Sequence, residues 1–247
     1  MNGETVKRLY DRALCAVFPR RCLYCGVPIV PEHTVCDDCL EHLPRISAPI
    51  CPLCGHQKAD CVCKQHKLQF KAVCAPFYYE DAIRTAVYRY KFENKDFLAS
   101  DFARDMAKTV RREYAEMQFD CVTFVPFTKK QLRTREWNPG ETLARALSKE
   151  LNLPCYTLLE KLYETESQHT LSARARTGNV FGVFEACNLE NVQGKTVLLV
   201  DDIKTTGATL SECAKMLKLG GAEAVYTVTF AVTRRKAKEK RPADEIG

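Results

Sequence analysis

Apolar residues are concentrated most strongly in two runs in the C-terminal part of the chain. Residues 196–200 read TVLLV and residues 224–232 read AVYTVTFAV, and both are rich in β-branched and aliphatic side chains. Short runs that are apolar at nearly every position predict strands buried on both faces, as in a parallel sheet. Between them, apolar residues recur at helical spacing at Leu210, Cys213, Ala214, Met216 and Leu217. Because Gly220-Gly221 ends that stretch, the pattern predicts a strand–helix–strand unit.

Similar elements alternate earlier in the chain. Residues 72–79 and 120–125 are predicted strands, and residues 81–90, 96–112 and 141–151 are predicted amphipathic helices. Strands that alternate with helices predict an α/β fold with a doubly wound, mainly parallel sheet. In such a sheet, a ligand is expected at the carboxyl ends of the strands.

The N-terminal segment, residues 1–21, has apolar positions at helical spacing and reaches Pro19, which predicts an amphipathic helix. Its charged residues interrupt every apolar stretch of signal-peptide length, so a secretory signal is not expected. No apolar run approaches the roughly 20 residues that a membrane-spanning helix needs. We therefore expect a cytoplasmic protein without a membrane span.

Cysteine is the one residue type whose distribution changes this picture. The chain has 247 residues, 46% of them hydrophobic, so it can build a core without disulfides, yet it contains 14 cysteines. Ten of the 14 lie within residues 1–74. In a reducing compartment, cysteines clustered in this way indicate metal ligands rather than disulfides.

Two cysteine clusters have the spacing of structural zinc sites. Cys22 and Cys25 form a CxxC pair followed by glycine, and Cys36 and Cys39 form a second pair. Two such pairs complete a closed tetrahedral site, which folds a segment and leaves no position open for a substrate. This segment predicts a first structural Zn²⁺.

The second cluster begins with the pair Cys51 and Cys54, again followed by glycine, but ends in Cys61 and Cys63, which only one residue separates. A second Zn²⁺ is predicted here. The irregular spacing leaves its fourth ligand open, since His56 or His66 could replace one thiolate. The remaining cysteines are expected to be packing residues: Cys15, Cys74, Cys121, Cys155, Cys187 and Cys213.

The net charge of +6 comes mainly from one place. Residues 234–241, RRKAKEKR, sum to +5, so the rest of the chain is nearly neutral. A solvated tail is one interpretation, and an electrostatic arm for nucleic acid is the other. Aromatic residues interleaved with basic ones, as on single-strand stacking surfaces, are not evident in the sequence.

The polar segment after the strand at residues 196–200 carries the strongest chemical signal, DDIKTTGAT. Backbone N–H groups at a helix start attract phosphate, and Gly207 lets the backbone approach an anion closely. Adjacent carboxylates suit the cis hydroxyls of a ribose, or Mg²⁺ bound to phosphate. The alternative, an acidic turn that caps a helix, explains a threonine but not the whole set. The predicted ligand-binding residues are Asp201, Asp202, Lys204, Thr205, Thr206, Gly207, Ala208 and Thr209, with Asp201 and Asp202 as the predicted catalytic residues.

This segment resembles the phosphoribosyl pyrophosphate (PRPP) motif of type I phosphoribosyltransferases. The cysteine knuckles ahead of it are similar to the double zinc ribbon of the ComF family, which is linked to competence and DNA uptake. The resemblance covers most of the chain, from about Cys22 to Arg234. It implies a type I phosphoribosyltransferase-like sheet with an N-terminal double zinc ribbon, and a site for PRPP with Mg²⁺.

Two further segments carry the resemblance. Residues 168–184 closely match a QxxLsxxxRxxNvxgxF-like family segment, and their polar surroundings at 164–178 predict a loop that closes over the site or a plain exposed connection. Residues 124–139 match a VPVP-like turn, a basic stretch and an RGFNQ-like segment, with departures at Phe127, Glu136, Trp137 and Pro139. Arg133 and Arg135 are predicted to neutralise the diphosphate, the alternative being surface charge. Trp137 is predicted to stack on a base or to anchor the following helix.

The predicted organisation is an N-terminal helix (1–21), a double zinc ribbon (22–69), a phosphoribosyltransferase-like domain (70–233) and a basic tail (234–247). The function implied is transfer of a 5-phosphoribosyl group from PRPP to an acceptor that the sequence does not name. The alternative is a non-catalytic protein that binds single-stranded DNA or senses PRPP during DNA uptake. The partners implied are PRPP, single-stranded DNA, and a DNA-uptake helicase or other competence proteins.

Overall fold

The computed structural model describes residues 19–61, 63, 68–93, 95–134, 137–162 and 183–234, and it is these residues that are discussed below. The predicted N-terminal helix as far as residue 18, the predicted loop at 164–178, Arg135 and His66 lie outside them. Within the described part of the chain, no helix is both long and apolar enough to cross a membrane.

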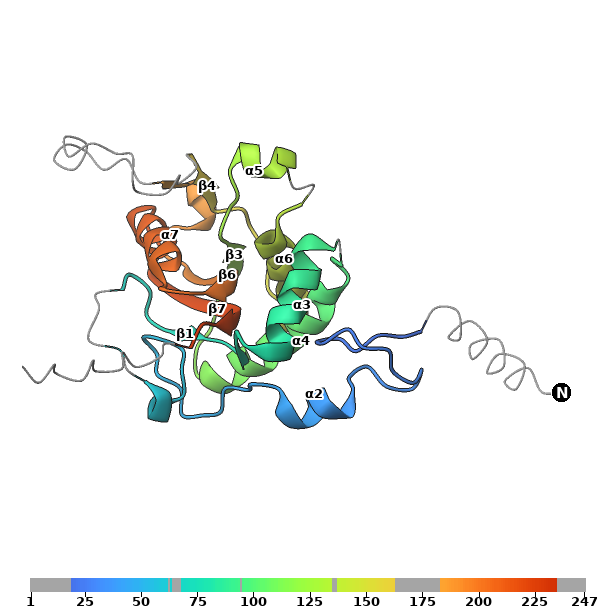
Figure 1. Ribbon diagram of the computed structural model, residues 1–247. Coiled ribbons are helices and arrows are strands. Elements are labelled where there is room, and N and C mark those ends of the chain that lie inside the picture. Colours follow the sequence, from blue (N-terminus) through green and yellow to red (C-terminus); the bar gives the residue numbers. More distant parts are fainter. Residues whose placement is uncertain are drawn as a thin grey trace, which may run out of the picture.

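A five-stranded parallel sheet forms the centre of the molecule (Figure 1). Strands β6 (Thr196–Lys204) and β7 (Ala224–Val232) lie side by side in it, and β3 (Cys121–Phe124) pairs with the outer side of β6. On the other side of β7, β1 (Val73–Cys74) and β2 (Phe77–Tyr78) pair in succession. All these pairs are parallel, as the apolar runs predicted.

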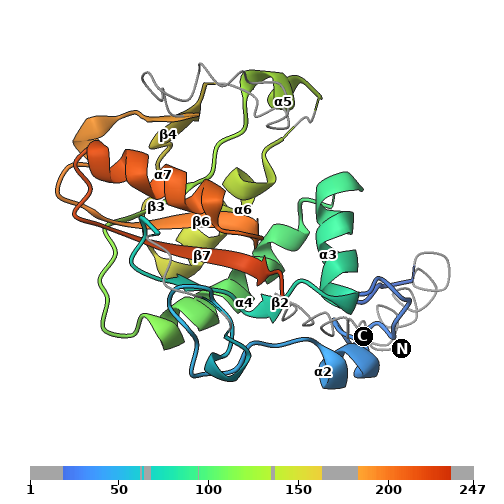
Figure 2. The same ribbon diagram turned by 60° about the vertical axis from the view of Figure 1, so that its left-hand side comes forward.

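Helices cover both faces of the sheet (Figure 2). Helices α4 (Leu98–Glu113) and α6 (Pro139–Leu151) pack together on one face. Helix α7 (Ala208–Leu219) covers the other face, beside a short antiparallel pair formed by β4 (Leu159–Lys161) and β5 (Phe184–Ala186). The predicted doubly wound α/β arrangement is therefore confirmed.

Other helical elements lie in the cysteine clusters and in the connections between strands. Helix α2 (Asp37–His42) belongs to the first cysteine cluster, and η1 (Lys58–Asp60) is a single 3₁₀ turn in the second. Helix α3 (Asp81–Phe92) follows β2. A second 3₁₀ turn, η3 (Leu189–Asn191), precedes β6.

The structure corrects the sequence analysis at three elements. The strand predicted at 72–79 is divided into β1 and β2 at Ala75-Pro76, because proline cannot continue the ladder. The strand predicted at 196–200 continues to residue 204. Helix α5 (Lys129–Thr134) was not predicted, although Thr128 and Gln131 form a reciprocal cap: Gln131 N donates to Thr128 Oγ1 at 3.0 Å, and Thr128 N donates to Gln131 Oε1 at 2.9 Å.

The cysteine-rich segment lies along the β1–β2 edge of the sheet. Tyr78 N donates to Pro44 O at 2.8 Å, and Val73 N donates to Pro52 O at 2.9 Å. Ile46 N donates to Pro76 O at 2.9 Å, in the gap between the two strands. The segment thus satisfies backbone groups that an open edge strand would leave to solvent.

Phe230 of β7 lies at the centre of the α4–α6 side of the core. Its ring stacks on Phe102 of α4 at 3.9 Å between centroids and meets Phe77 of β2 edge-on at 5.4 Å. All three side chains are buried. The contacts join the central strand, the edge strand and a covering helix.

Replacing Phe230 with alanine is expected to lower the free energy of unfolding by about 3–5 kcal/mol, because it leaves a cavity among buried rings. Urea denaturation measures this loss. Phe97, which is 62% exposed, offers the control: Phe97→Ala should leave the unfolding midpoint nearly unchanged. Equal losses in the two variants would contradict this account of the core.

Candidate functional site

The end of β6 carries charged residues into the interior. Because neighbouring residues of a strand face opposite sides of a sheet, Asp201 and Asp202 diverge. Asp202 is buried beside α3, whereas Asp201 is half-buried on the α7 side, where its charge acts on Cys213. The two carboxylates therefore lie on opposite sides of the strand end, close enough for the charge of Asp202 to act on Asp201.

Asp202 forms an ion pair that the sequence analysis missed. Lys91, near the end of α3, places its Nζ atom 2.6 Å from Asp202 Oδ2, and both side chains are largely buried. A buried carboxylate requires such a partner, since an unpaired charge away from water is costly. No sequence pattern marks Lys91, because the contact joins segments more than 100 residues apart.

Asp201 is in a different electrostatic environment. Burial, and then the neighbouring Asp202 carboxylate, raise the pKa of Asp201 to about 7, although Lys91 and Lys161 act in the opposite direction. Its Oδ1 atom accepts a hydrogen bond from Asp202 N at 2.9 Å. The carboxyl is therefore poised to gain or lose a proton near neutral pH.

The segment from Thr205 to Gly207 turns sharply into α7. Gly207 has φ = 84°, a left-handed conformation that favours glycine. Thr206 Oγ1 accepts from Ala208 N at 3.3 Å, while Thr205 and Thr209 are exposed. The first turn of α7 contains no acidic residue, so its partial positive charge is not neutralised there. A helix start of this kind can accept an anion, so phosphate binding at residues 205–209 stays a prediction.

Lys204 is a predicted ligand-binding residue, but its side chain points into the cysteine-rich segment. It is only 3% exposed, and its Nζ atom donates to the carbonyl oxygen of Cys54, in the second cysteine cluster, at 3.1 Å. The ammonium group is thus directed into the cysteine-rich segment. The main chain of Lys204 lies directly before the turn into α7.

The other predicted site residues belong to the segment after β3: Arg133, Arg135 and Trp137. Arg133 is exposed on α5, which follows the carboxyl end of β3, and Arg135 lies outside the described residues. Trp137 is partly buried against the core, with its ring 4.8 Å from that of Tyr90, so it anchors the start of α6. The role for Trp137 in stacking on a base is therefore not the one that the structure favours.

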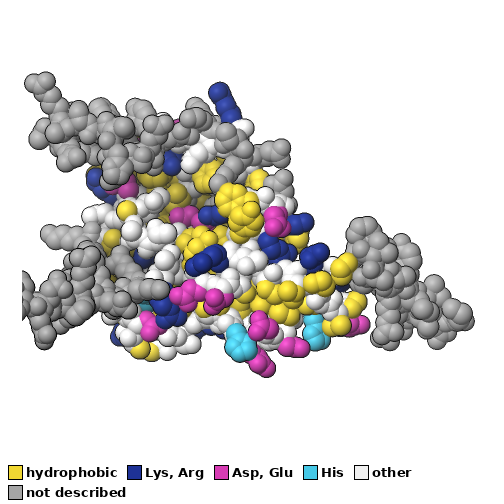
Figure 3. Space-filling model, viewed as in Figure 1, with side chains coloured by type: hydrophobic (Ala, Val, Ile, Leu, Met, Phe, Trp, Pro, Cys, Tyr) yellow, Lys and Arg dark blue, Asp and Glu magenta, His cyan; other side chains and the backbone are white. Residues whose placement is uncertain are grey.

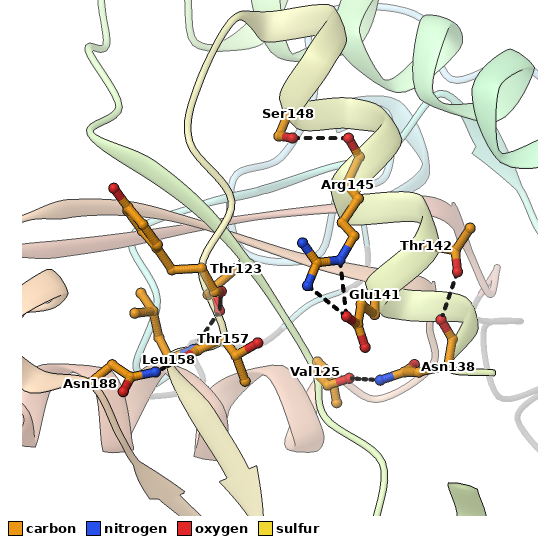
Figure 4. Close-up of polar contacts among 11 residues, drawn as sticks. Thr123, Val125, Asn138, Glu141, Thr142, Arg145, Ser148, Thr157, Leu158 and Asn188 are labelled. Carbon is orange, nitrogen blue, oxygen red and sulfur yellow. Dashed lines mark hydrogen bonds and ion pairs between the residues drawn. The ribbon is translucent and has the colours of Figure 1, made fainter.

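Asn138 fixes the start of α6 (Figure 4). Its Oδ1 atom accepts from Gly140 N at 3.0 Å, and its Nδ2 atom donates to Val125 O at 3.4 Å. This asparagine caps the helix and ties it to the end of β3. Asn138 thus fixes the start of α6 relative to the end of β3.

Each cysteine cluster brings four thiols within reach of one metal ion, and Cys61 and Cys63 lie closest together, at 3.0 Å. The thiols of each predicted set lie within 4.8 Å of one another. Three of the thiol pairs, Cys25–Cys36, Cys51–Cys63 and Cys54–Cys61, are each 3.6 Å apart, close to the roughly 3.8 Å between thiolates around tetrahedral zinc. The complete sets are Cys22, Cys25, Cys36 and Cys39, and Cys51, Cys54, Cys61 and Cys63.

The second set consists of four thiols, which removes His56 as a ligand. His56 is buried, and its Nε2 atom lies 3.1 Å from Thr233 O, so the ring holds the cluster to the end of β7. Among the cysteines predicted to pack, Cys74, Cys121 and Cys213 are buried, whereas Cys155 and Cys187 are partly exposed. Cys15 lies outside the described residues.

The beginning of the basic tail belongs to the folded body. Arg234 places its guanidinium 3.7 Å from the centroid of the Tyr78 ring and pairs with Asp60 at 2.7 Å and Glu80 at 3.1 Å. This residue is therefore not part of a free electrostatic arm. Residues 235–247 lie outside the described part of the chain.

Comparison with known proteins agrees with both halves of this arrangement. Residues 13–76 match the double zinc ribbon domain, and residues 138–246 match the phosphoribosyl transferase domain. Competence protein ComFC of Bacillus subtilis (strain 168) is 27% identical over 213 residues, which cover 81% of this chain and 85% of that protein. The chain belongs to the ComF family. The resemblance seen in the sequence is thereby confirmed.

Two other relatives extend over similar lengths. DNA utilization protein YhgH of Escherichia coli (strain K12) is 29% identical, over 84% of this chain and 94% of that protein. Competence protein F of Haemophilus influenzae is 28% identical, over 84% and 95%. Among solved structures, the glutamine PRPP amidotransferase of B. subtilis is 21% identical, covers 58% of this chain and 30% of that chain, and has a TM-score of 0.42. The two matched family models show that this ComF family protein combines a double zinc ribbon with a phosphoribosyltransferase domain.

The raised pKa of Asp201 predicts a pH-dependent difference in stability. Between its ordinary pKa of 3.8 and about 7, the folded state binds more protons than the unfolded state, so this residue lowers the free energy of unfolding as pH rises. Asp201→Asn keeps the acceptor for Asp202 N and removes that titration. Relative to wild type, the variant should gain stability from pH 5 to pH 7, measured by urea denaturation. A difference independent of pH would contradict the assignment.

Proposed function

We propose that this ComF family protein binds PRPP with Mg²⁺ at the turn after β6 and transfers its phosphoribosyl group to an acceptor. The observation that carries the proposal is the arrangement at the strand end, where the carboxylates of Asp201 and Asp202 flank an anion-binding turn that begins α7. The 5-phosphate would bind the N–H groups and hydroxyls of residues 205–209. The carboxylates would bind ribose hydroxyls or Mg²⁺.

The reaction would need little covalent assistance. Positive charge develops at ribose C1 as Mg²⁺-bound pyrophosphate leaves, so the protein contributes positioning and charge stabilisation. Lys91 is suited to adjust the charge at Asp202 during ligand binding, because its ammonium contacts the carboxylate directly. Arg133, and Arg135 beyond the described residues, are proposed to meet the diphosphate.

A second candidate function, binding of single-stranded DNA, has its own structural support. Tyr88 and Phe92 are 56% and 55% exposed, and their rings lie 5.1 Å apart, because residues four apart share a helix face. Phe97 is exposed nearby, and Lys95 approaches its ring at 6.0 Å. Figure 3 shows hydrophobic and basic side chains near one another on this side of the molecule. The sequence analysis missed this surface, since only helical geometry brings the exposed rings together.

A hollow lined in part by basic residues adjoins the ring of Phe97. Its volume is about 310 Å³, and Arg20, Arg21, Lys95 and Phe97 are among the residues that line it. Exposed rings beside cations are the features that hold bases and phosphates of single strands. Together with the names of the relatives, competence and DNA utilization proteins, this supports a cytoplasmic role in DNA uptake, with PRPP as substrate or signal.

Titration calorimetry with PRPP and Mg²⁺ tests the first proposal. We expect binding to wild type and a loss of about 100-fold in affinity for Asp201→Asn with Asp202→Asn, because charge-assisted contacts to both carboxylates disappear. Glu212→Gln, on the outer side of α7, should bind as wild type does. Absence of binding to wild type would refute the proposal. Pyrophosphate release in a panel of acceptor bases would then separate transfer from PRPP sensing.

Fluorescence anisotropy with a labelled oligonucleotide tests the second candidate. Tyr88→Ala with Phe97→Ala should weaken binding about 10-fold or more, since each stacked base contributes roughly 1–3 kcal/mol. Tyr156→Ala, an exposed ring on the connection between α6 and β4, is the control and should bind like wild type. Binding to wild type should also weaken with salt. Equal affinity in all three proteins would exclude these rings as the DNA surface.

A further inference from the structure

Lys204 joins the anion-binding turn to the second zinc site. Its Nζ atom donates to Cys54 O at 3.1 Å, and its stem lies under Gly207, where an added Cβ would be 3.0 Å from Lys204 Cε. The side chain is almost fully buried. A buried ammonium needs its acceptors held in place, so the position of Lys204 depends on the position of the Cys54 carbonyl.

The carbonyl of Cys54 is fixed by the knuckle around it. Gly55 N donates to Cys51 O at 2.8 Å, and a Cβ at Gly55 would lie 3.3 Å from Val232 Cγ1. The knuckle is thus seated at the carboxyl end of β7, which is the edge of the sheet where the ligand turn lies. Cys54 therefore offers a thiol to the metal site and a carbonyl to Lys204, and bound Zn²⁺ would hold the two together.

The first knuckle is connected to the site in a parallel way. Arg89 of α3 donates from Nη1 to Cys22 O at 3.0 Å and to Leu23 O at 3.2 Å. Lys91, two residues further along the same helix, faces away from the ribbon and contacts Asp202. The first zinc site therefore orients the helix that delivers Lys91 to Asp202.

We propose that the zinc ribbon is one half of the ligand site. Lys204 and Arg89 are positioning residues that connect metal occupancy of the two clusters to the anion-binding turn and to the Asp202–Lys91 pair. Zinc and the phosphate ligand then bind cooperatively, and each raises the affinity of the other by the same factor, typically about 5- to 150-fold for coupled sites. The predicted effect of the ligand on zinc binding (the ligand arm) rests on the proposed binding of PRPP. The predicted effect of Lys204 and Arg89 on zinc binding (the zinc arm) does not.

Zinc release to a chromophoric chelator, followed on the full chain without any ligand, tests the zinc arm. Lys204→Met keeps the stem under Gly207 and removes the donor, so one of the two zinc ions should leave at least about 5-fold faster. Arg89→Met should accelerate release of the other. Lys218→Met, exposed at the end of α7, is the control, and Lys204→Arg should restore slow release. Wild-type release rates in both methionine variants would overturn the proposal.

The ligand arm repeats the measurement with PRPP and Mg²⁺. PRPP should slow zinc release in wild type and should have little effect in Lys204→Met, which a purely structural role of Lys204 does not predict. An equal slowing in both proteins would overturn the coupling. If calorimetry shows that wild type does not bind PRPP, the proposed function fails, and the release rates without ligand still decide the zinc arm.

Hydrogen exchange tests the same coupling on the wild-type protein, so its result does not depend on whether a variant folds. Removal of zinc by a chelator should reduce the protection of the amides at residues 205–211, because the support under Gly207 is lost. Unchanged protection in this segment, with reduced protection confined to residues 19–63, would overturn the proposal.

Discussion

The cost of burying charge at the end of β6 determines how the rest of the molecule is assembled. This strand carries Asp202 and Lys204 into the interior, where neither can remain without a partner of opposite polarity. Asp202 receives Lys91 from α3, and Lys204 receives a carbonyl oxygen from the second knuckle. Each partner comes from a different part of the chain, so satisfying the strand end requires the helix, the sheet and the cysteine-rich segment to meet at one place.

The two domains recognised in the sequence are therefore closely interdependent. The ribbon supplies backbone acceptors to Lys204 and Arg89, and the sheet supplies Thr233 O to His56. Arg234 closes the arrangement by stacking on Tyr78 while it pairs with Asp60 of the ribbon. Metal ligation and the packing of the sheet thus stabilise the same interface, although their sequence signals lie far apart.

Local patterns predicted much of the fold and the type of site. The apolar runs of β6 and β7 and the helical spacing of α7 predicted a parallel sheet, and the paired cysteines predicted two metal clusters. The capping box at Thr128 and Gln131 was also present in the sequence as a signal for α5, and was overlooked. Lys91 could not have been predicted in this way, since its role depends on a contact between distant segments that no periodicity marks.

The side-chain directions around the turn after β6 were also not predicted from the sequence. The motif of this turn predicts a phosphorylated ribose as ligand, which stays a prediction, and Gly207 has the left-handed conformation that such a turn requires. The side-chain directions of Asp201 and Asp202 depend instead on the strand, which is longer than predicted. Because both residues belong to β6, their side chains leave it on opposite sides. The same extension places Lys204 where its ammonium group reaches the second cysteine cluster.

The contacts between the ribbon and β1–β2 have a consequence for the behaviour of the metal-free protein. Pro44, Pro52 and Pro76 take part in backbone hydrogen bonds that cover the outer side of this edge. If the ribbon unfolds, a short apolar strand edge becomes available for pairing with another chain, and such edges promote aggregation. Zinc starvation would then remove this protein from solution through self-association, before any slower loss of its core.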